Sequence, residues 1–298
     1  MNTMQAPSKV LLRNILVATD FSGASDAALR YALPIARRYD AHLYVAHVIR
    51  PDAYQLVPAD AMPNVLGQAR RYAEQEMANV LVSGRLRGVP HEVLLKEGEI
   101  WPALLQMLED QRVDLVVVGT HGRTGVRKLL LGSVAEEIFR LSPCPVLTVG
   151  PHAQTPESNE AELAHILYAT DFTPASERAA TFAFSLAQEH QARLTLLHVI
   201  QDVSITETSA HAVTLVREFF QRRLVQMIPE GAEQWCEPDC EIEFGKPATE
   251  ILRVAAHKRA DLMVLGVRQT GNFPGHLPPA TAYQVVCQAP CPVLTVRG

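Results

Sequence analysis

Residues 114–122 read Asp114-Leu-Val-Val-Val-Gly119-Thr-His-Gly122, and after nine further residues the chain continues as Gly132-Ser133-Val-Ala-Glu-Glu-Ile-Phe-Arg-Leu141. The first run is short, apolar and β-branched, which predicts a buried strand, and the last is apolar at helical spacing, which predicts a helix from Ser133. The glycines therefore lie at a strand-to-helix connection. There, backbone N–H groups and the positive end of the helix dipole favour an anion. We interpret the segment as a phosphate-binding loop.

Two other readings of this loop stay open. Glycines at strand ends also form turns, and Ser133 also suits a helix N-cap with no ligand present. Phosphate binding is favoured by four basic residues within the same stretch, although the last two also suit a solvated surface: His121, Arg123, Arg127 and Lys128. The loop is not a Walker A motif, because Gly132 is followed by Ser133-Val134 and not by Lys with Ser or Thr, and its spacing is not that of the dinucleotide fingerprint.

The chain repeats itself. Ile15-Leu-Val-Ala-Thr-Asp20-Phe-Ser-Gly-Ala-Ser25 returns as Ile166-Leu-Tyr-Ala-Thr-Asp171-Phe-Thr-Pro-Ala-Ser176 at an offset of 151, and Pro143-Cys-Pro-Val-Leu-Thr-Val149 returns as Pro290-Cys-Pro-Val-Leu-Thr-Val296 at an offset of 147. Two homologous domains follow, residues 1–150 and 151–298, and each has the usual size of a single core. The linker between them, residues 150–161, is polar and contains two prolines.

Strands and helices alternate within each half, which predicts an α/β fold with parallel strands joined by right-handed crossovers. In the first half we expect strands at Ile15–Thr19, His42–Ile49, His91–Lys96, Leu115–Gly119 and Pro145–Val149, and helices at Ser25–Tyr39, Asn64–Arg87, Ile100–Gln111 and Ser133–Leu141. In the second half we expect strands near Ile166–Ala169, Arg193–Ile200, Cys240–Phe244, Leu262–Gly266 and Pro292–Val296, with a long helix at Ala210–Met227.

Composition and charge limit the classes of function that the protein can have. A hydrophobic content of 48%, a charged content of 20% and a formal charge of −5 describe a soluble globular protein and disfavour nucleic acid as a partner. The N-terminal residues lack a signal-peptide core, and no run approaches the roughly 18 apolar residues of a membrane helix, so a cytoplasmic protein with no membrane partner is expected. Among the five cysteines, Cys144 and Cys291 occupy equivalent positions that suit buried structural thiols. Neither Cys236 with Cys240 nor Cys287 with Cys291 has zinc spacing, so no metal site is assigned.

Three features together resemble the universal stress protein family: the duplicated five-stranded α/β domain, Ala18-Thr19-Asp20 at the end of the first strand, and the Gly-x-x-Gly, nine residues, Gly-Ser spacing. The chain is similar to a tandem member of that family over almost all of both halves. The resemblance implies two doubly wound domains, each with a five-stranded parallel sheet of order 3-2-1-4-5. It also implies ATP, with Mg²⁺, at the carboxyl ends of strands one and four, and intramolecular pairing of the two domains.

The resemblance assigns roles residue by residue. Asp20 would face the adenine and ribose, Ala18 would line the pocket, and the backbone of Val48 would read the adenine edge. The ribose and phosphates would be held by Gly119, Thr120, His121, Gly122 and Arg123, and the triphosphate would meet the amides and hydroxyl of Gly132, Ser133 and Val134. Two alternatives stay open, in which Asp20 only caps the first helix and His47 is an ordinary core histidine.

The second half departs from this pattern. Asp171, Val199 and Gly266 remain, but Gln269 replaces the second glycine, and Pro279-Ala280 stands in place of Gly132-Ser133. Proline lacks an N–H and alanine lacks a hydroxyl, so the second domain is not expected to bind ATP in this way.

Three functions are therefore weighed. The first is a cytoplasmic stress-response protein that binds ATP in its N-terminal domain and acts as a regulatory module. The second is a slow Mg²⁺-dependent ATPase or phosphotransferase assisted by Asp20 or His121, and the third is a related fold that binds flavin or AMP. No motif places a second carboxylate or a lysine for phosphoryl transfer, so no catalytic residue is assigned. Protein partners, and the choice between a monomer and a homodimer, stay open.

Overall fold

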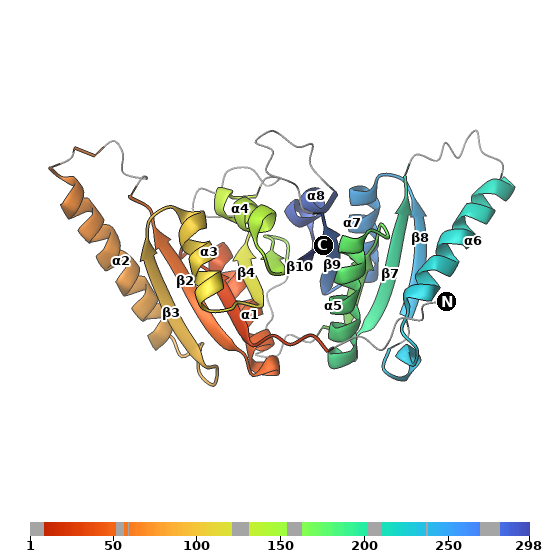
Figure 1. Cartoon of the computed structure of the whole chain (residues 1–298), viewed down its shortest axis with the longest axis horizontal. Coiled ribbons are helices and arrows are strands. Elements are labelled where there is room, and N and C mark those ends of the chain that lie inside the picture. The colour runs from red at the N-terminus through yellow and green to blue at the C-terminus, as the bar shows by residue number, and fades with distance from the viewer. Residues whose placement is uncertain are drawn as a thin grey trace. The chain divides into compact units, whose positions relative to one another are not determined.

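The computed structural model describes residues 9–51, 57–58, 60–120, 131–153, 163–201, 210–236, 238–268 and 281–298. The chain divides into two compact units, centred on residues 11–151 and on residues 162–298. Strands and helices alternate through both of them (Figure 1).

The first unit is a parallel α/β sheet of order β3-β2-β1-β4-β5. Its elements are β1 (Asn14–Ala18), α1 (Gly23–Tyr39), β2 (His42–Ile49), α2 (Met62–Val82), β3 (His91–Glu97), α3 (Ile100–Asp110), β4 (Leu115–Gly119), α4 (Ser133–Leu141) and β5 (Val146–Val149).

The second unit repeats this topology, with the parallel order β8-β7-β6-β9-β10. Its elements are β6 (His165–Ala169), α5 (Pro174–His190), β7 (Arg193–Ile200), α6 (Ala210–Met227), the 3₁₀ turn η2 (Ala232–Gln234), β8 (Pro238–Phe244), α7 (Pro247–Lys258), β9 (Leu262–Val267), α8 (Thr281–Gln288) and β10 (Val293–Arg297). The predicted fold class and the predicted strand order 3-2-1-4-5 are therefore confirmed in both units.

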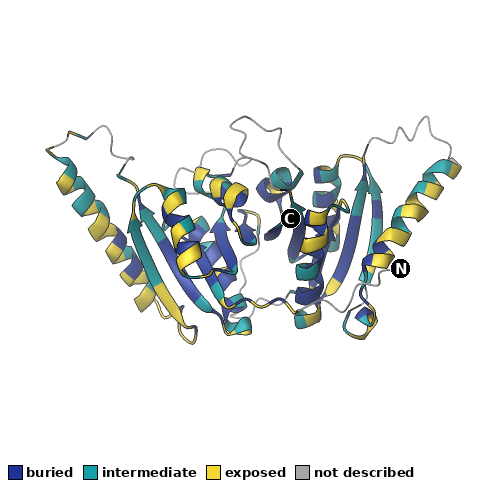
Figure 2. Cartoon of the chain, in the orientation of Figure 1, coloured by how far each residue is buried: buried dark blue, intermediate teal, exposed yellow. Residues whose placement is uncertain are grey.

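The core of each unit lies between the sheet and its covering helices, as the dark blue central strands of Figure 2 show. Parallel strands with helices on both faces are apolar along their whole length, and β1 is buried from Ile15 to Ala18. The small residues Ala28, Ala32 and Ala36 of α1 have no exposed surface. They let this helix pack on β1, β4 and β5.

An aspartate fixes the start of the first strand in both units. Asp114 Oδ2 accepts the N–H groups of Arg13 and Asn14 at 2.8 and 2.9 Å. Asp261 Oδ2 accepts the N–H groups of Ala164 and His165, both at 2.9 Å. The aspartate that precedes the fourth strand therefore recurs in both halves because it holds the start of the first strand.

Most predicted boundaries are within two residues of the observed ones, and the largest error is at the end of α2. The helix expected at Asn64–Arg87 begins at Met62 and ends at Val82, with Ser83 as its C-cap. Gly84 follows with φ of 74°, a left-handed conformation that ends a helix at low cost when the residue is glycine.

Candidate functional site

A cavity of about 490 Å³ lies at the carboxyl ends of β1, β2 and β4 in the first unit. Adjacent strands β1 and β4 are the point at which the chain reverses direction across the sheet, because β1 leads to β2 on one side and β4 leads to β5 on the other. Such switch points are where open α/β sheets bind ligands, and the volume lies within the roughly 300–1,000 Å³ of small-molecule sites.

Most of the predicted site residues lie together around this cavity. Seven of them line it: Ala18, Asp20, Val48, Gly119, Gly132, Ser133 and Val134. Thr120 is not among the described residues of the lining. It is buried, its N–H donates to Val149 O at 3.0 Å, and its carbonyl oxygen accepts the N–H of Gly132 at 2.8 Å. His121, Gly122 and Arg123 lie outside the described residues, as do Arg127 and Lys128.

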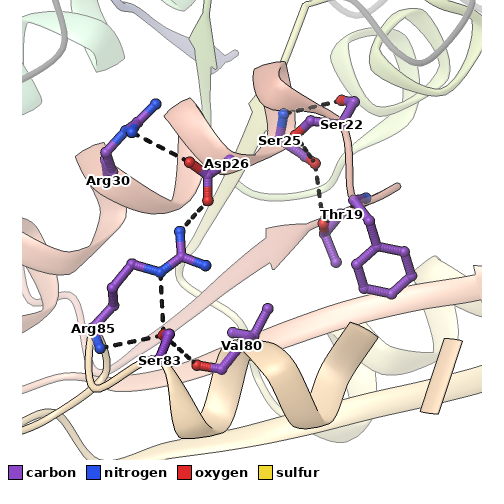
Figure 3. Close-up of polar contacts among 9 residues, drawn as sticks. Thr19, Ser22, Ser25, Asp26, Arg30, Val80, Ser83 and Arg85 are labelled. Carbon is purple, nitrogen blue, oxygen red and sulfur yellow. Dashed lines mark hydrogen bonds and ion pairs between the residues drawn. The ribbon is translucent and has the colours of Figure 1, made fainter. Parts of the chain in front are cut away.

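The end of β1 and the start of α1 form one hydrogen-bonded turn beside the cavity (Figure 3). Ser22 caps α1 by accepting the Ser25 N–H at 3.3 Å, and Thr19 Oγ1 donates to Ser25 Oγ at 3.1 Å. In the same view Asp26 lies between Arg30 and Arg85, and Arg85 Nε donates to Ser83 Oγ at 3.2 Å. These contacts join the first turn of α1 to the loop that follows α2.

Asp20 does not cap α1, since Ser22 does. Its Oδ1 instead accepts the Ser22 N–H at 3.0 Å, which fixes the carboxylate at the cavity wall. Phe21 takes a positive φ of 62° and donates its N–H to Thr19 Oγ1 at 3.0 Å. Positive φ is costly for a bulky residue, so this turn is held by its surroundings. Neither the composition nor the motif spacing of the sequence indicated this positive-φ turn.

Gly119 is required for packing. A Cβ on this residue would lie 2.6 Å from both the carbonyl carbon and the oxygen of Ala24, which is too close. The same holds in the second unit, where a Cβ on Gly266 would lie 2.3 Å from the Ser176 nitrogen. The glycine at the carboxyl end of the fourth strand, the last residue of β4 and the last but one of β9, therefore lets the first helix approach the sheet, whether or not a phosphate binds.

The N-terminus of α4 opens into the cavity. Gly132 is the N-cap and makes no side-chain capping bond, so Ser133 is the first helical residue and not the cap. The first N–H groups of a helix have no partner within it, and together with the helix dipole they attract anions. The Gly132 N–H is already donated to Thr120, but Ser133, Val134 and Ala135 also line the cavity, so the first helical N–H groups lie where the sequence placed a phosphate.

The backbone of Val48 is directed past the end of β1. β1 pairs with β2 only as far as Ala46, whose carbonyl oxygen accepts the Thr19 N–H at 2.8 Å. Polar groups of residues two apart on a strand point to the same neighbour, so the N–H and C=O of Val48 point to the side that β1 no longer occupies. This geometry suits the edge of a planar base.

His47 has a backbone partner. Its Nδ1 donates to the carbonyl oxygen of Thr19 at 2.7 Å, and its ring lies 4.5 Å from that of Phe21. In the second unit His198 donates in the same way to Thr170 at 2.8 Å. The interpretation of His47 as a core histidine is therefore supported, although the residue also contributes to the cavity wall.

Sequence reasoning missed part of the cavity wall, most of which comes from helices and loops. The additional lining residues include Ser25, Ile49, Arg50, Ala69, Tyr72, Ile100 and Leu104. Tyr72 is 49% exposed, and the centroid of its ring lies 6.2 Å from that of Phe21 in an edge-on arrangement. A tyrosine on an amphipathic helix belongs to no sequence motif, so its position in the cavity wall follows only from the fold.

The corresponding aspartate of the second unit is already engaged. Asp171 Oδ1 accepts the N–H and the hydroxyl of Thr173 at 3.1 and 2.6 Å, and Oδ2 pairs with Arg268 Nη2 at 3.3 Å. Burial raises the pKa of Asp171, but the bonds from Thr173 and the charge of Arg268 outweigh burial and hold that pKa below its ordinary value of 3.8.

Aromatic rings stack beside this aspartate. Phe220 lies 5.8 Å from Phe172 and 4.5 Å from His198, and the Arg223 guanidinium lies 4.2 Å above the Phe172 ring. In the first unit the ring of Tyr72, also from the second helix, meets Phe21 edge-on at 6.2 Å. The two units therefore differ in how these rings are arranged, since Phe172 and Phe220 are stacked.

Comparisons with known proteins agree with this organisation. The model of the universal stress protein family matches residues 12–150 and again residues 162–297. A universal stress protein of Mycolicibacterium smegmatis is 28% identical over 95% of this chain and 96% of its own length. One from Methanocaldococcus jannaschii is 30% identical over 50% of this chain and 88% of its own length. The crystal structure of a universal stress protein from Archaeoglobus fulgidus has a TM-score of 0.70 at 21% identity, and the match covers 95% of this chain and 98% of that one.

No helix within the described ranges is both long enough and apolar enough to cross a lipid bilayer.

Proposed function

Because this chain belongs to the universal stress protein family, with one family domain in each half, we propose that it is a regulatory module that binds ATP in its first unit. The observation that supports this most strongly is the cavity at the β1–β4 switch point, which has the uncapped N-terminus of α4 in its wall. Apolar strand ends meet the base there, and helix N–H groups meet the phosphates.

Each part of the cavity suits one part of the nucleotide. The adenine would lie against Ala18 with its edge at the Val48 backbone, and the Asp20 carboxylate would accept hydrogen bonds from the ribose. The triphosphate would lie at Gly132 and Ser133. Loop residues His121, Gly122 and Arg123 are proposed to complete the phosphate site, with Gly119 and Thr120 leading into it.

Mg²⁺ fits this arrangement as a companion of the phosphates. Proteins usually hold it through phosphate oxygens, waters and one or two carboxylates. Asp20 is the carboxylate among the described residues of the cavity wall. The ion would neutralise phosphate charge and would not need a dedicated protein cage.

The second unit is proposed not to bind ATP in this way. Its aspartate is bonded to Thr173 and Arg268, and the Phe172–Phe220 stack occupies neighbouring space. Pro279 and Ala280, which replace the glycine and serine of the first unit in the sequence, lie outside the described residues. We propose that this unit has a structural or regulatory role.

We also propose a cytoplasmic location. All five cysteines are free thiols, and unpaired thiols are typical of reducing compartments. Cell fractionation with an antibody against the chain would test this, and recovery in an oxidising compartment would contradict it.

A thermal shift with ATP and Mg²⁺ tests the proposed function. ATP at about 100 times its Kd should stabilise the binding unit by about 2.7 kcal/mol, which corresponds to roughly 2–4 °C for each kcal/mol. Ser133→Pro is the matched variant, because proline is tolerated at the first helical position but removes the N–H, and α5 and α7 already begin with Pro174 and Pro247.

The expected result is a shift in the wild type that is lost in Ser133→Pro, with unchanged circular dichroism. No shift in the folded wild type would overturn the proposal. Phosphate released during overnight incubation with ATP then separates a binding module from the alternative of a slow ATPase.

A further inference from the structure

A second cavity, of about 480 Å³, adjoins the first and shares Arg50, Ile100 and Ser133 with it. It lies at the N-terminal turns of α3 and α4, which pack against each other (Figure 1). The rest of its described lining comprises Glu99, Trp101, Pro102, Glu136, Glu137 and Arg140. The two cavities therefore meet at Ser133, where the phosphates of a nucleotide in the first cavity would lie.

The charges of the second cavity do not suit a bare phosphate. Its described side chains include two guanidinium groups and three carboxylates, and Arg140 Nη1 pairs with Glu136 Oε1 at 3.7 Å. Another anion would meet more negative than positive charge. Carboxylates accept hydrogen bonds, so they suit a neutral group rich in donors, such as ribose hydroxyls and the amino group of a base.

Trp101 gives this cavity an aromatic wall. It is half-buried in the first turn of α3 and lines the cavity beside Glu99, whose side chain makes no capping bond to that helix. Nucleic-acid bases stack on exposed aromatic rings with little dependence on the identity of the base. Arg50, which belongs to both cavities, supplies positive charge at the boundary between them.

We propose that the two cavities together bind a dinucleoside polyphosphate. One nucleoside occupies the first cavity, the phosphate chain passes Ser133 and Arg50, and the second nucleoside stacks on Trp101. This inference rests on the proposed function, because the first cavity must accept a nucleotide. It adds that the preferred ligand is larger than ATP.

Isothermal titration of the full chain with ATP and with diadenosine tetraphosphate, each with Mg²⁺, tests the inference. We expect the dinucleotide to bind about tenfold more tightly than ATP, the scale of one stacked base. Trp101→Ala should remove this preference and leave ATP affinity unchanged. The control is Trp235→Ala, which changes the other tryptophan of the chain and should keep the preference.

Fluorescence provides a second readout that does not depend on the alanine variant. In Trp235→Phe, Trp101 is the sole tryptophan. Diadenosine tetraphosphate should quench its emission at saturation, whereas saturating ATP should leave it nearly unchanged. Quenching by both ligands to the same extent would contradict a second base site.

The outcomes separate the two proposals. ATP binding without a preference for the dinucleotide overturns the inference and leaves the proposed function standing. The same conclusion follows if Trp101→Ala weakens the binding of both ligands equally. Failure of the wild type to bind either ligand overturns both.

Discussion

The backbone of Ala24 packs directly against Gly119, because a Cβ on Gly119 would lie 2.6 Å from the Ala24 carbonyl oxygen. This contact places the first turn of α1 against the end of β4, and with it the Ser22–Ser25 cap and Asp20 at the cavity. A residue of the predicted phosphate loop is thus also a packing residue.

Gly119→Ala should therefore destabilise the first unit. Overpacking at a tight contact costs about 1–3 kcal/mol of unfolding free energy. Gly23→Ala is the matched control, because a Cβ at Gly23 would meet nothing within 4 Å. Urea unfolding followed by circular dichroism measures both variants. Equal stability of the two would show that the Ala24 contact does not require glycine.

Much of the fold could be predicted from the sequence because periodicity and repetition report it. The strand His42–Ile49 and the helix Ala210–Met227 have the predicted bounds, and the doubled motifs led to two domains of one topology. The end of α2 was missed because apolar spacing continued beyond Val82, whereas the left-handed Gly84 ends the helix. The backbone conformation of Gly84, and not the apolar periodicity, decides where this helix ends.

The candidate site could be predicted only in part. Residues that belong to strand ends, such as Ala18 and Asp20, follow from motifs. Tyr72 and Trp101 reach their cavities from helices, and their positions depend on how those helices pack on the sheet. The Asp171–Arg268 pair joins residues far apart in the chain, so no local pattern encodes it.

Tyr72→Ala should weaken ATP binding while leaving the fold intact, because the ring is half-exposed at the cavity wall. Loss of about 1 kcal/mol of ring contact corresponds to roughly fivefold weaker binding. Tyr72→Phe keeps the ring and should bind ATP as the wild type does. Competition binding with a fluorescent ATP analogue measures the series. If alanine and phenylalanine behave alike, the ring does not contact the nucleotide.

The stability of the second unit should depend on pH through Asp171. Its pKa in the folded state lies below its ordinary value of 3.8. The contribution of this carboxylate is thus fully present above about pH 4 and is lost as the pH falls through the folded pKa. Urea midpoints of wild type and Asp171→Asn should differ most at about pH 6, and the difference should shrink as the pH falls below about 4. A difference that grows toward acid would contradict the assigned sign.

The cysteines should resist thiol reagents in the folded protein. Burial raises the pKa of Cys236 to about 11, and burial with the nearby charge of Asp239 does the same for Cys240. Burial raises the pKa of Cys291 further, to about 12, and also raises that of Cys144. At about pH 8 few thiolates form, so a disulfide reagent should react slowly until denaturant is added. A thiol that reacts in the folded chain as fast as free cysteine would show an exposed site.

The stoichiometry of ATP binding tests the central claim most directly. Isothermal titration of the full chain with ATP and Mg²⁺ should give one ATP per chain, and Ser133→Pro should abolish the heat of binding while the circular dichroism spectrum stays unchanged. Binding that survives Ser133→Pro unaltered, or no binding by the wild type, would contradict a nucleotide site at the N-terminus of α4.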